Sequence, residues 1–242
     1  MFLLTLKSEQ MKLHKSPIWI PFFAIPCISA FMGTFNYLAN KDILTKEWYS
    51  LWTQHTIFYC YFFLPVLIGI YCAYLCRLEN INNNWNSILT SPVSIKSIYF
   101  SKFITVMKML LFTQIFEGIL FYISGKFAGF TTKIPSEMFL WLLLGFCAGA
   151  AIVSVQLTIS LVIKSFSVPI GISLLGGFLG VAATAKGVGL YFPYSLFSIG
   201  MCANNPSAAA GYSISAFVIS CVLFVIIFSK LGIIALEPNN NW

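Results

Sequence analysis

Long apolar runs separated by short polar stretches dominate the chain. Six of these runs are long enough to cross the hydrocarbon core of a bilayer, which is ~30 Å thick and takes about 20 residues of helix. The runs are expected at 17–38, 55–78, 103–124, 137–163, 167–185 and 212–236. The pattern therefore predicts an all-α integral membrane protein, with residues 1–242 forming a single transmembrane domain.

Two shorter segments do not fit the pattern of a span. Residues 1–16 mix apolar and charged side chains, which predicts an amphipathic helix lying on the membrane surface. Ser16 and Pro17 would begin the first span as its N-cap and first residue. Residues 190–201 are mostly apolar but too few to cross a membrane, and Pro193 interrupts them. They predict a re-entrant segment before the sixth span.

Composition excludes a soluble protein and a soluble enzyme domain. Apolar residues make up 59% of the chain, charged residues 9%, and the mean hydropathy is +0.86. Soluble domains are about 25% charged. Six spans use about half the chain, and no remaining loop is long enough to fold as an enzyme domain.

Motifs for chemistry are missing from the sequence. There is no G-x-x-x-x-G-K-[ST] loop, so we expect no nucleotide site on this chain and no catalytic residues. Most of the cysteines fall inside apolar runs, where a thiol behaves as a small hydrophobe. Cys72 and Cys76 have helical i,i+4 spacing, but no nearby histidine or carboxylate completes a metal site. We therefore expect no metal and no cofactor on this chain.

The charge pattern indicates a membrane surface rather than nucleic acid. The net charge is +7, and the 14 basic residues are scattered between the spans without a dense basic run. With both termini in the cytoplasm, nine basic residues lie inside and five outside, as the positive-inside rule favours. The inner set is Lys7, Lys12, Lys15, Arg77, Lys96, Lys102, Lys108, Lys164 and Lys230, and the outer set is Lys41, Lys46, Lys126, Lys133 and Lys186.

Glu117 stands in the middle of the third span, where an isolated carboxylate is costly. Its nearest basic neighbour on the helix, Lys108, is nine residues away, which corresponds to a rise of about 13.5 Å and the opposite helix face. Glu117 therefore needs a partner on another helix or subunit, a proton, or a cationic substrate. His55, at the start of the second span, is expected at the membrane edge.

Two small-xxx-small patterns occur, at 145–149 in the fourth span and 176–180 in the fifth. Such patterns let helix backbones approach closely. They predict tight packing either inside the chain or between two copies of it.

The connection between the second and third spans carries the most specific pattern. Trp85, Ile88 and Leu89 lie at i, i+3 and i+4 and form one apolar helical face, and Ser91-Pro92 ends the helix. A second short helix over 94–102 is expected to lead into the third span. A short amphipathic helix on the cytoplasmic side suits the groove of a soluble partner, or it rests on lipid.

This connection resembles that of the type-2 ABC exporter permeases. The resemblance is strongest to the branch that protects Gram-positive bacteria against lantibiotics and bacitracin-like peptides. The matching residues are Glu79, Asn84-Trp85, Thr90-Ser91-Pro92, Ile95, Tyr99 and Ser101-Lys102, together with Leu6-Lys7-Ser8-Glu9 and Lys12 near the N-terminus.

The resemblance implies a transmembrane permease subunit in a bacterial plasma membrane. Its partners would be a second permease, identical or related, and two soluble ATPase subunits that bind ATP and Mg. The cargo would be a cationic antimicrobial peptide removed from the membrane. An ATP-independent channel or secondary transporter is the competing interpretation, and it predicts more intramembrane ionisable residues than Glu117. The residues expected to couple ATPase motion to the spans are Glu79, Trp85, Ile88, Leu89, Ser91 and Pro92.

Overall fold

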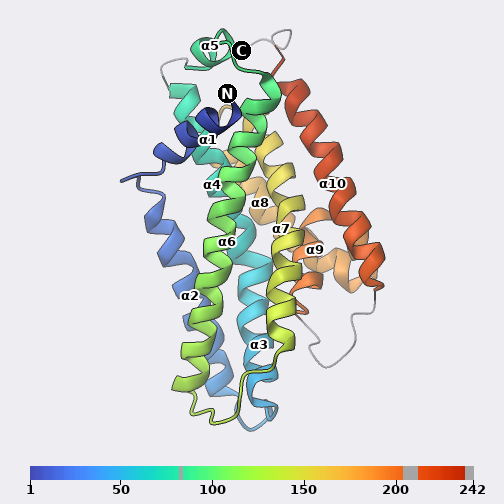
Figure 1. Cartoon of the computed structure of the whole chain (residues 1–242). Coiled ribbons are helices and arrows are strands. Elements are labelled where there is room, and N and C mark those ends of the chain that lie inside the picture. The colour runs from blue at the N-terminus through green and yellow to red at the C-terminus, as the bar shows by residue number, and fades with distance from the viewer. Residues whose placement is uncertain (82–83, 204–211, 238–242) are drawn as a thin grey trace.

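Six long helices form an elongated bundle in the computed structural model, which describes residues 1–81, 84–203 and 212–237 (Figure 1). Each is long and apolar enough to cross a membrane. No strand occurs among the described residues, so the prediction of an all-α protein with six spans is confirmed. The spans are α2 (Trp19–Ala39), the helices of Glu47–Asn80, α6 (Ile95–Phe127), α7 (Glu137–Val162), α8 (Ser167–Ala185) and α10 (Ile214–Ala235).

The second span consists of three consecutive helical pieces. They are α3 (Glu47–Phe58), the π-helical segment η1 (Tyr59–Phe63) and α4 (Leu64–Asn80). Pro65 explains the π segment, because a proline inside a helix has no N–H for the carbonyl four residues earlier and its ring crowds that carbonyl. The backbone adapts by shifting to the wider spacing, with the Leu64 N–H donating to the Tyr59 carbonyl.

This span begins eight residues earlier than the sequence pattern suggested, at Glu47 instead of His55. Residues 47–54, which lie outside the predicted spans, therefore belong to α3. Trp48, Leu51 and Trp52 lie at i, i+3 and i+4, and all three are buried against neighbouring helices. Polar residues beside them lower the average hydropathy, so the sequence pattern did not reveal this helical face.

The third span is also longer than expected. α6 runs without a break for 33 residues, so the separate helix predicted over 94–102 is its first turns. Ser94 caps this helix, its side-chain oxygen accepting a hydrogen bond from the Ser97 N–H at 3.2 Å. A helix of this length rises about 50 Å, well beyond the ~30 Å hydrocarbon core.

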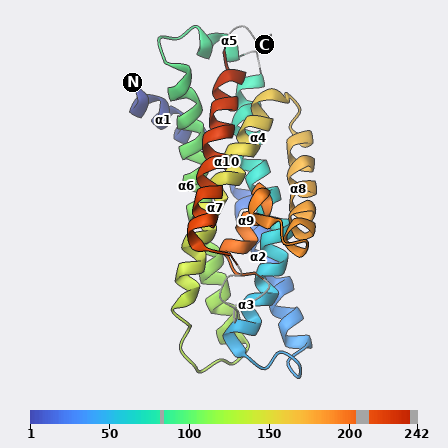
Figure 2. The ribbon, with the colours of Figure 1, turned by 90° about the vertical axis from the view of Figure 1, so that its right-hand side faces the viewer.

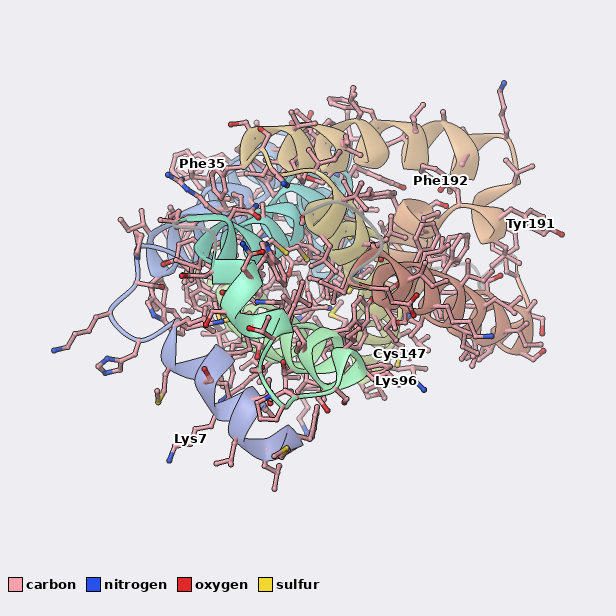
Figure 3. All side chains as sticks on the ribbon, turned by 90° about the horizontal axis from the view of Figure 1, so that it is seen from above. Lys7, Phe35, Lys96, Cys147, Tyr191 and Phe192 are labelled. Atoms are coloured by element: carbon pink, nitrogen blue, oxygen red, sulfur yellow. The ribbon has the colours of Figure 1, made fainter. Side chains whose placement is uncertain are left out.

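The short helices α1 (Phe2–Met11) and α5 (Asn84–Leu89) lie at one end of the bundle, where α10 also ends (Figure 1). We call this the α5 end. α1 packs against α6. Lys7 on α1 and Lys96 on α6 point away from the bundle in the view from this end (Figure 3). The helix predicted for residues 1–16 is therefore present, although it ends at Met11.

A short helical segment lies between α8 and α10, as predicted for residues 190–201. It contains the 3₁₀ turn η3 (Gly189–Tyr191) and α9 (Pro193–Gly200), and Pro193 stands in the first turn of α9, where its missing N–H costs nothing. α9 packs among α7, α8 and α10 (Figure 2). Leu196 and Phe197 are fully buried there, whereas Tyr191 of η3 points outward (Figure 3).

The small-xxx-small patterns of α7 and α8 serve packing inside the chain. A Cβ on Gly177 would stand 2.2 Å from the Tyr61 carbonyl oxygen, so only glycine allows α8 to approach η1. The other four glycines of these patterns face neighbours within the chain in the same way. Gly145 faces Met201 and Gln114, Gly149 faces Leu110, and Gly176 and Gly180 face Tyr194.

Candidate functional site

Four charged side chains meet inside the α5 end of the bundle, and we call them the ionic cluster. Glu9 comes from α1, Lys12 from just after α1, Glu79 from the last turn of α4 and Lys102 from the third turn of α6. Lys102 is 0% exposed, Glu79 3% and Glu9 4%. The cluster thus ties the surface helix to the ends of the second and third spans.

Each lysine of the ionic cluster contacts both carboxylates. Lys102 Nζ donates to Glu79 Oε1 at 2.8 Å and to the two carboxylate oxygens of Glu9 at 3.1 and 3.2 Å. Lys12 Nζ donates to Glu9 Oε1 at 2.7 Å and also to Glu79 Oε1. Two cations face two anions, so the cluster is neutral. Buried charges are tolerated when each one is paired and hydrogen-bonded in this way.

Trp85 attaches α5 to this cluster. The Trp85 ring centroid lies 5.4 Å from Lys102 Nζ, within the range of a cation–π contact. The Trp85 Nε1–H donates to Asn80 Oδ1 at 2.7 Å, just beyond Glu79 in the chain. The sequence pattern placed Trp85 on an apolar face presented either to a soluble partner or to lipid. That was wrong, because the ring is 4% exposed and packs inside this chain.

The surface that α5 leaves open is polar. Ile88 and Leu89 are half-buried and pack against the core, so the whole predicted apolar face turns inward. A six-residue helix with only a few large apolar side chains buries them and exposes the rest. The exposed side chains are Asn84, Asn86, Ser87, Thr90 and Pro92.

Ser91 and Pro92 form the turn between α5 and α6. The Ser91 hydroxyl donates to the Ile88 carbonyl at 2.5 Å, and the Val93 N–H donates to the Ser91 carbonyl at 2.7 Å. These bonds close the last turn of α5 and redirect the chain toward Ser94, the cap of α6. The predicted helix stop at Ser91-Pro92 is therefore present.

A groove of about 320 Å³ opens beside this turn, between α1 and the α5–α6 connection. Glu9 and Lys12 of the ionic cluster contribute to its wall, so the cluster borders the groove as well as the bundle interior. The remaining lining residues are mostly apolar or small: Met1, Leu4, Thr5, Ser8, Ile88, Ser91, Val93 and Ile98.

Glu117 lies far from this cluster, in the second half of α6, and is 4% exposed. Its Oε1 is 3.4 Å from His55 Nδ1 of α3, a long contact for a hydrogen bond. His55 Nε2 is 3.0 Å from Thr34 Oγ1 of α2. Among the described residues, Glu117 Oε2 has no hydrogen-bond partner. His55, the polar side chain nearest to the Glu117 carboxylate, is therefore on another helix of the same chain.

His55, which the sequence placed at a membrane edge, is 1% exposed inside the bundle and lies beside Glu117. The reason is the early start of α3, which places two helical turns before His55. α2 comes so close at this point that a Cβ on Gly33 would stand 2.7 Å from the His55 Cα. Glycine at position 33 therefore lets α2 and α3 pack closely. This close packing brings Thr34 within hydrogen-bond distance of His55, which in turn contacts Glu117.

Sequence reasoning identified Glu79, Trp85 and Glu117 but not the partners that hold them. The sequence analysis used Lys12 and Lys102 only as basic residues of the inner side, and all three of Glu9, Lys12 and Lys102 as matches to the permease pattern. The available signal was local: Glu9 and Lys12 are three residues apart, and Lys102 lies at the start of the predicted third span. The contacts with Glu79 span 67 and 23 residues of sequence, which no local pattern detects.

The described residues contain no group of three or more histidine, cysteine, aspartate and glutamate side chains placed to hold a metal ion.

A comparison with curated proteins gives no match. Residues 5–180 match the family model described as ABC-2 family transporter protein. That stretch includes most of α1, the ionic cluster, α5 and Glu117. With six apolar helices and a match over most of its length, the chain belongs to the ABC-2 transporter family and is a multi-pass membrane permease subunit of an ABC transporter, with a transport role rather than a catalytic one.

Proposed function

We propose that this permease works in a bacterial plasma membrane as an exporter of cationic antimicrobial peptides, with the α5 end in the cytoplasm. It would pair with a second permease, identical or related, and with two separate ATPase subunits that bind ATP and Mg. The observation that carries the proposal is the polar surface of α5 beside the ionic cluster. It offers a soluble partner a contact surface that is mechanically joined to two spans.

Coupling would pass through Trp85. An ATPase that pushes on the exposed side of α5 moves the Trp85 ring, which contacts Lys102 at the start of the third span. Lys102 in turn holds Glu79 at the end of the second span. Because Glu9, Glu79 and Lys102 are buried and paired, a shift of α5 that moves Lys102 would strain these ion pairs.

Peptide cargo is supported by the resemblance of residues 77–102 to the lantibiotic-protection permeases and by Glu117. Of the seven acidic residues in the chain, Glu117 alone lies in the middle of a span. Cells that express the permease with its ATPase should tolerate several-fold more of a lantibiotic than cells that express the permease alone. An equal growth-inhibitory concentration in the two strains would contradict the peptide assignment while leaving the permease assignment intact.

Trp85→Ala should weaken ATPase docking without preventing membrane insertion. Truncating a buried Trp to Ala inside a chain costs about 3–5 kcal/mol, and here it releases α5 from the ionic cluster. We expect the amount of ATPase that co-purifies with the permease to fall at least several-fold. Ser87→Arg, on the exposed face of α5, tests direct contact and should have a similar effect. Thr131→Arg, an exposed site at the other end of the bundle, is the matched control.

Wild-type levels of co-purified ATPase with both Trp85→Ala and Ser87→Arg would remove α5 from the docking surface. A loss with Thr131→Arg as well would show that any added charge disturbs assembly. Neither outcome depends on knowing the cargo.

The orientation gives a separate prediction for two lysines. Lys96 lies in the first turn of α6, at the α5 end, and Lys186 directly follows α8, toward the opposite side. In a background without the native cysteines, cysteine at position 186 should react with an impermeant maleimide in intact cells. Cysteine at position 96 should react only after the membrane is opened. Labelling of position 96 in intact cells would reverse the orientation.

A further inference from the structure

A second cavity lies between α6 and α7, in the half of the bundle away from the α5 end. It has a volume of about 500 Å³, which falls in the range of small-molecule sites. Its lining is almost wholly apolar and aromatic, and includes Trp52, Gly118, Tyr122 and Leu142. Gln114 is its one amide, and that amide already donates to the Leu142 carbonyl at 3.3 Å. The cavity therefore suits an apolar chain.

The mouth of the cavity faces the membrane. Ile115 and Ile119 on α6 and Phe139 on α7 line it, and these side chains are 53%, 51% and 64% exposed in the isolated chain. Both helices are candidate spans. Apolar side chains on the outside of a span are in contact with lipid tails, so the cavity is a cleft open to the bilayer.

Gly118 has no packing role inside the chain that would explain it. A Cβ there would meet only Leu142 Cδ1, at an ordinary 3.4 Å, whereas a Cβ on Gly125 of the same helix would collide with the Trp48 ring at 2.2 Å. Glycine also weakens a helix by about 1 kcal/mol relative to alanine. Gly118 therefore keeps the cleft open at a cost to the helix.

Positive charge stands at the outer rim of the cleft. Lys126 Nζ lies 5.7 Å from the ring centroid of Tyr122, which lines the cleft, and the exposed Lys133 directly precedes the lining residue Ile134. Glu137 is the one acid in the segment from 126 to 137, while Glu47 accepts a hydrogen bond from Thr132 and Lys41 donates to the Ala128 carbonyl. These three lysines against two glutamates leave a net charge of +1 there.

The depth of Lys126 matches that of a lipid headgroup. Lys108 and Lys126 are 18 residues apart on α6, a rise of about 27 Å. This is close to the ~30 Å hydrocarbon core, so the two lysines mark its two edges. Gly118 lies about 12 Å deeper than Lys126, at the level of acyl chains.

We propose that the cleft between α6 and α7 binds one acyl chain of an anionic phospholipid, whose phosphate lies beside Lys126 and Lys133. A lysine near the membrane surface attracts anionic lipid by about 1 kcal/mol, or about fivefold in affinity. The same charge repels a cationic peptide, so this cleft is distinct from any path for such a cargo. The proposal is independent of the function proposed above.

The test uses the full chain, purified in detergent and incubated with equal amounts of phosphatidylglycerol and phosphatidylcholine that carry the same acyl chains. Native mass spectrometry counts the bound lipids. The wild type should retain phosphatidylglycerol in preference to phosphatidylcholine. Gly118→Phe fills the cleft and should lower retention about tenfold. Gly171→Phe is the matched control, because Gly171 is also on a span and has open space at its Cβ, and it should retain lipid like the wild type.

The lysines provide a second arm that does not disturb the bundle, since both side chains are exposed. Lys126→Ser with Lys133→Ser should abolish the preference for phosphatidylglycerol while phosphatidylcholine still binds. If Gly118→Phe does not purify as a folded protein, the lipid preference of the double lysine variant tests the proposal by itself. An unchanged preference for phosphatidylglycerol would then contradict it.

Three results would overturn the proposal. The first is equal lipid retention by the Gly118→Phe variant and the wild type. The second is no preference of the wild type between the two lipids. The third is a wild-type dimer that Gly118→Phe converts to a monomer, because the cleft would then be a contact between two copies of the chain.

Discussion

Lys102→Met should destabilise the permease by about 3–5 kcal/mol, the usual cost of removing one partner from a buried ion pair. Methionine retains an apolar stem, so the loss is of charge more than of volume. Glu9 and Glu79, both buried, would be left facing each other with only Lys12, whose side chain is 25% exposed. At about 2–4 °C per kcal/mol for a chain of this size, we expect a fall of roughly 10 °C in the Tm of the detergent-purified protein.

Lys108→Met is the matched control for this variant. Lys108 is on the same helix and near the membrane edge, but it is exposed and contacts only the Phe112 ring among the described interactions. Its replacement should change stability by less than about 1 kcal/mol. If the two methionine variants melt at the same temperature, the ionic cluster does not hold the α5 end together.

A double variant separates charge balance from packing. Glu9→Gln combined with Lys102→Met leaves Lys12 and Glu79 as one neutral pair, so it should recover part of the loss. The effects of the two changes should therefore be non-additive by 0.5–3 kcal/mol, the range for residues in one network. Additive losses would mean that Glu9 and Lys102 act independently.

The spans were predictable because the bilayer requires about 20 apolar residues from each of them, and this is a property of local sequence. Pro193 and the short run around it likewise revealed α9, because a run too short to span must lie inside the bundle. The start of α3 was not predictable in the same way. Ser50 lies between Trp48 and Leu51, and Glu47 and Gln54 flank the group, so polar residues lower the average hydropathy without breaking the helix.

The direction in which a helix faces was the least predictable property. In α5, three apolar side chains on one side looked like a face for a partner, but the same pattern suits burial against the chain itself. Only the position of Lys102 and Asn80 decides between the two, since these residues bind the Trp85 ring and its N–H. They lie 17 residues after and 5 residues before Trp85, beyond the reach of a helical pattern.

The partners of buried charges were likewise not predictable from local sequence. The sequence showed that Glu117 needs a partner, because a lone carboxylate in a span is costly. It did not show that His55 is near, since the contact joins residues 62 apart on two helices. The role of Glu117 in transport thus stays a prediction, and its contact with His55 sharpens the way to test it.

His55→Leu should destabilise the fold by about 3 kcal/mol if Glu117 is charged, because the carboxylate then loses its neighbour in the bundle. Glu117→Gln keeps the size of the side chain and deletes its charge, so it should leave the Tm within about 1 kcal/mol of the wild type. Combining the two changes should recover stability relative to His55→Leu alone. Equal stability of His55→Leu and the wild type would show that Glu117 holds a proton and does not depend on His55.

The transport role of Glu117 is tested with the same Glu117→Gln variant, which is expected to fold and to co-purify with its partners. If its carboxylate attracts a cationic peptide, cells carrying the variant should lose several-fold in protection against a lantibiotic while the amounts of permease and ATPase stay unchanged. If it pairs instead with a basic residue of a second permease, assembly should fall as well, because that charge would be left buried and unpaired. Glu117→Asp is the matched control, since it keeps the charge and should retain part of the protection. Unchanged protection and unchanged assembly with Glu117→Gln would remove Glu117 from the cargo path and leave it as the structural neighbour of His55.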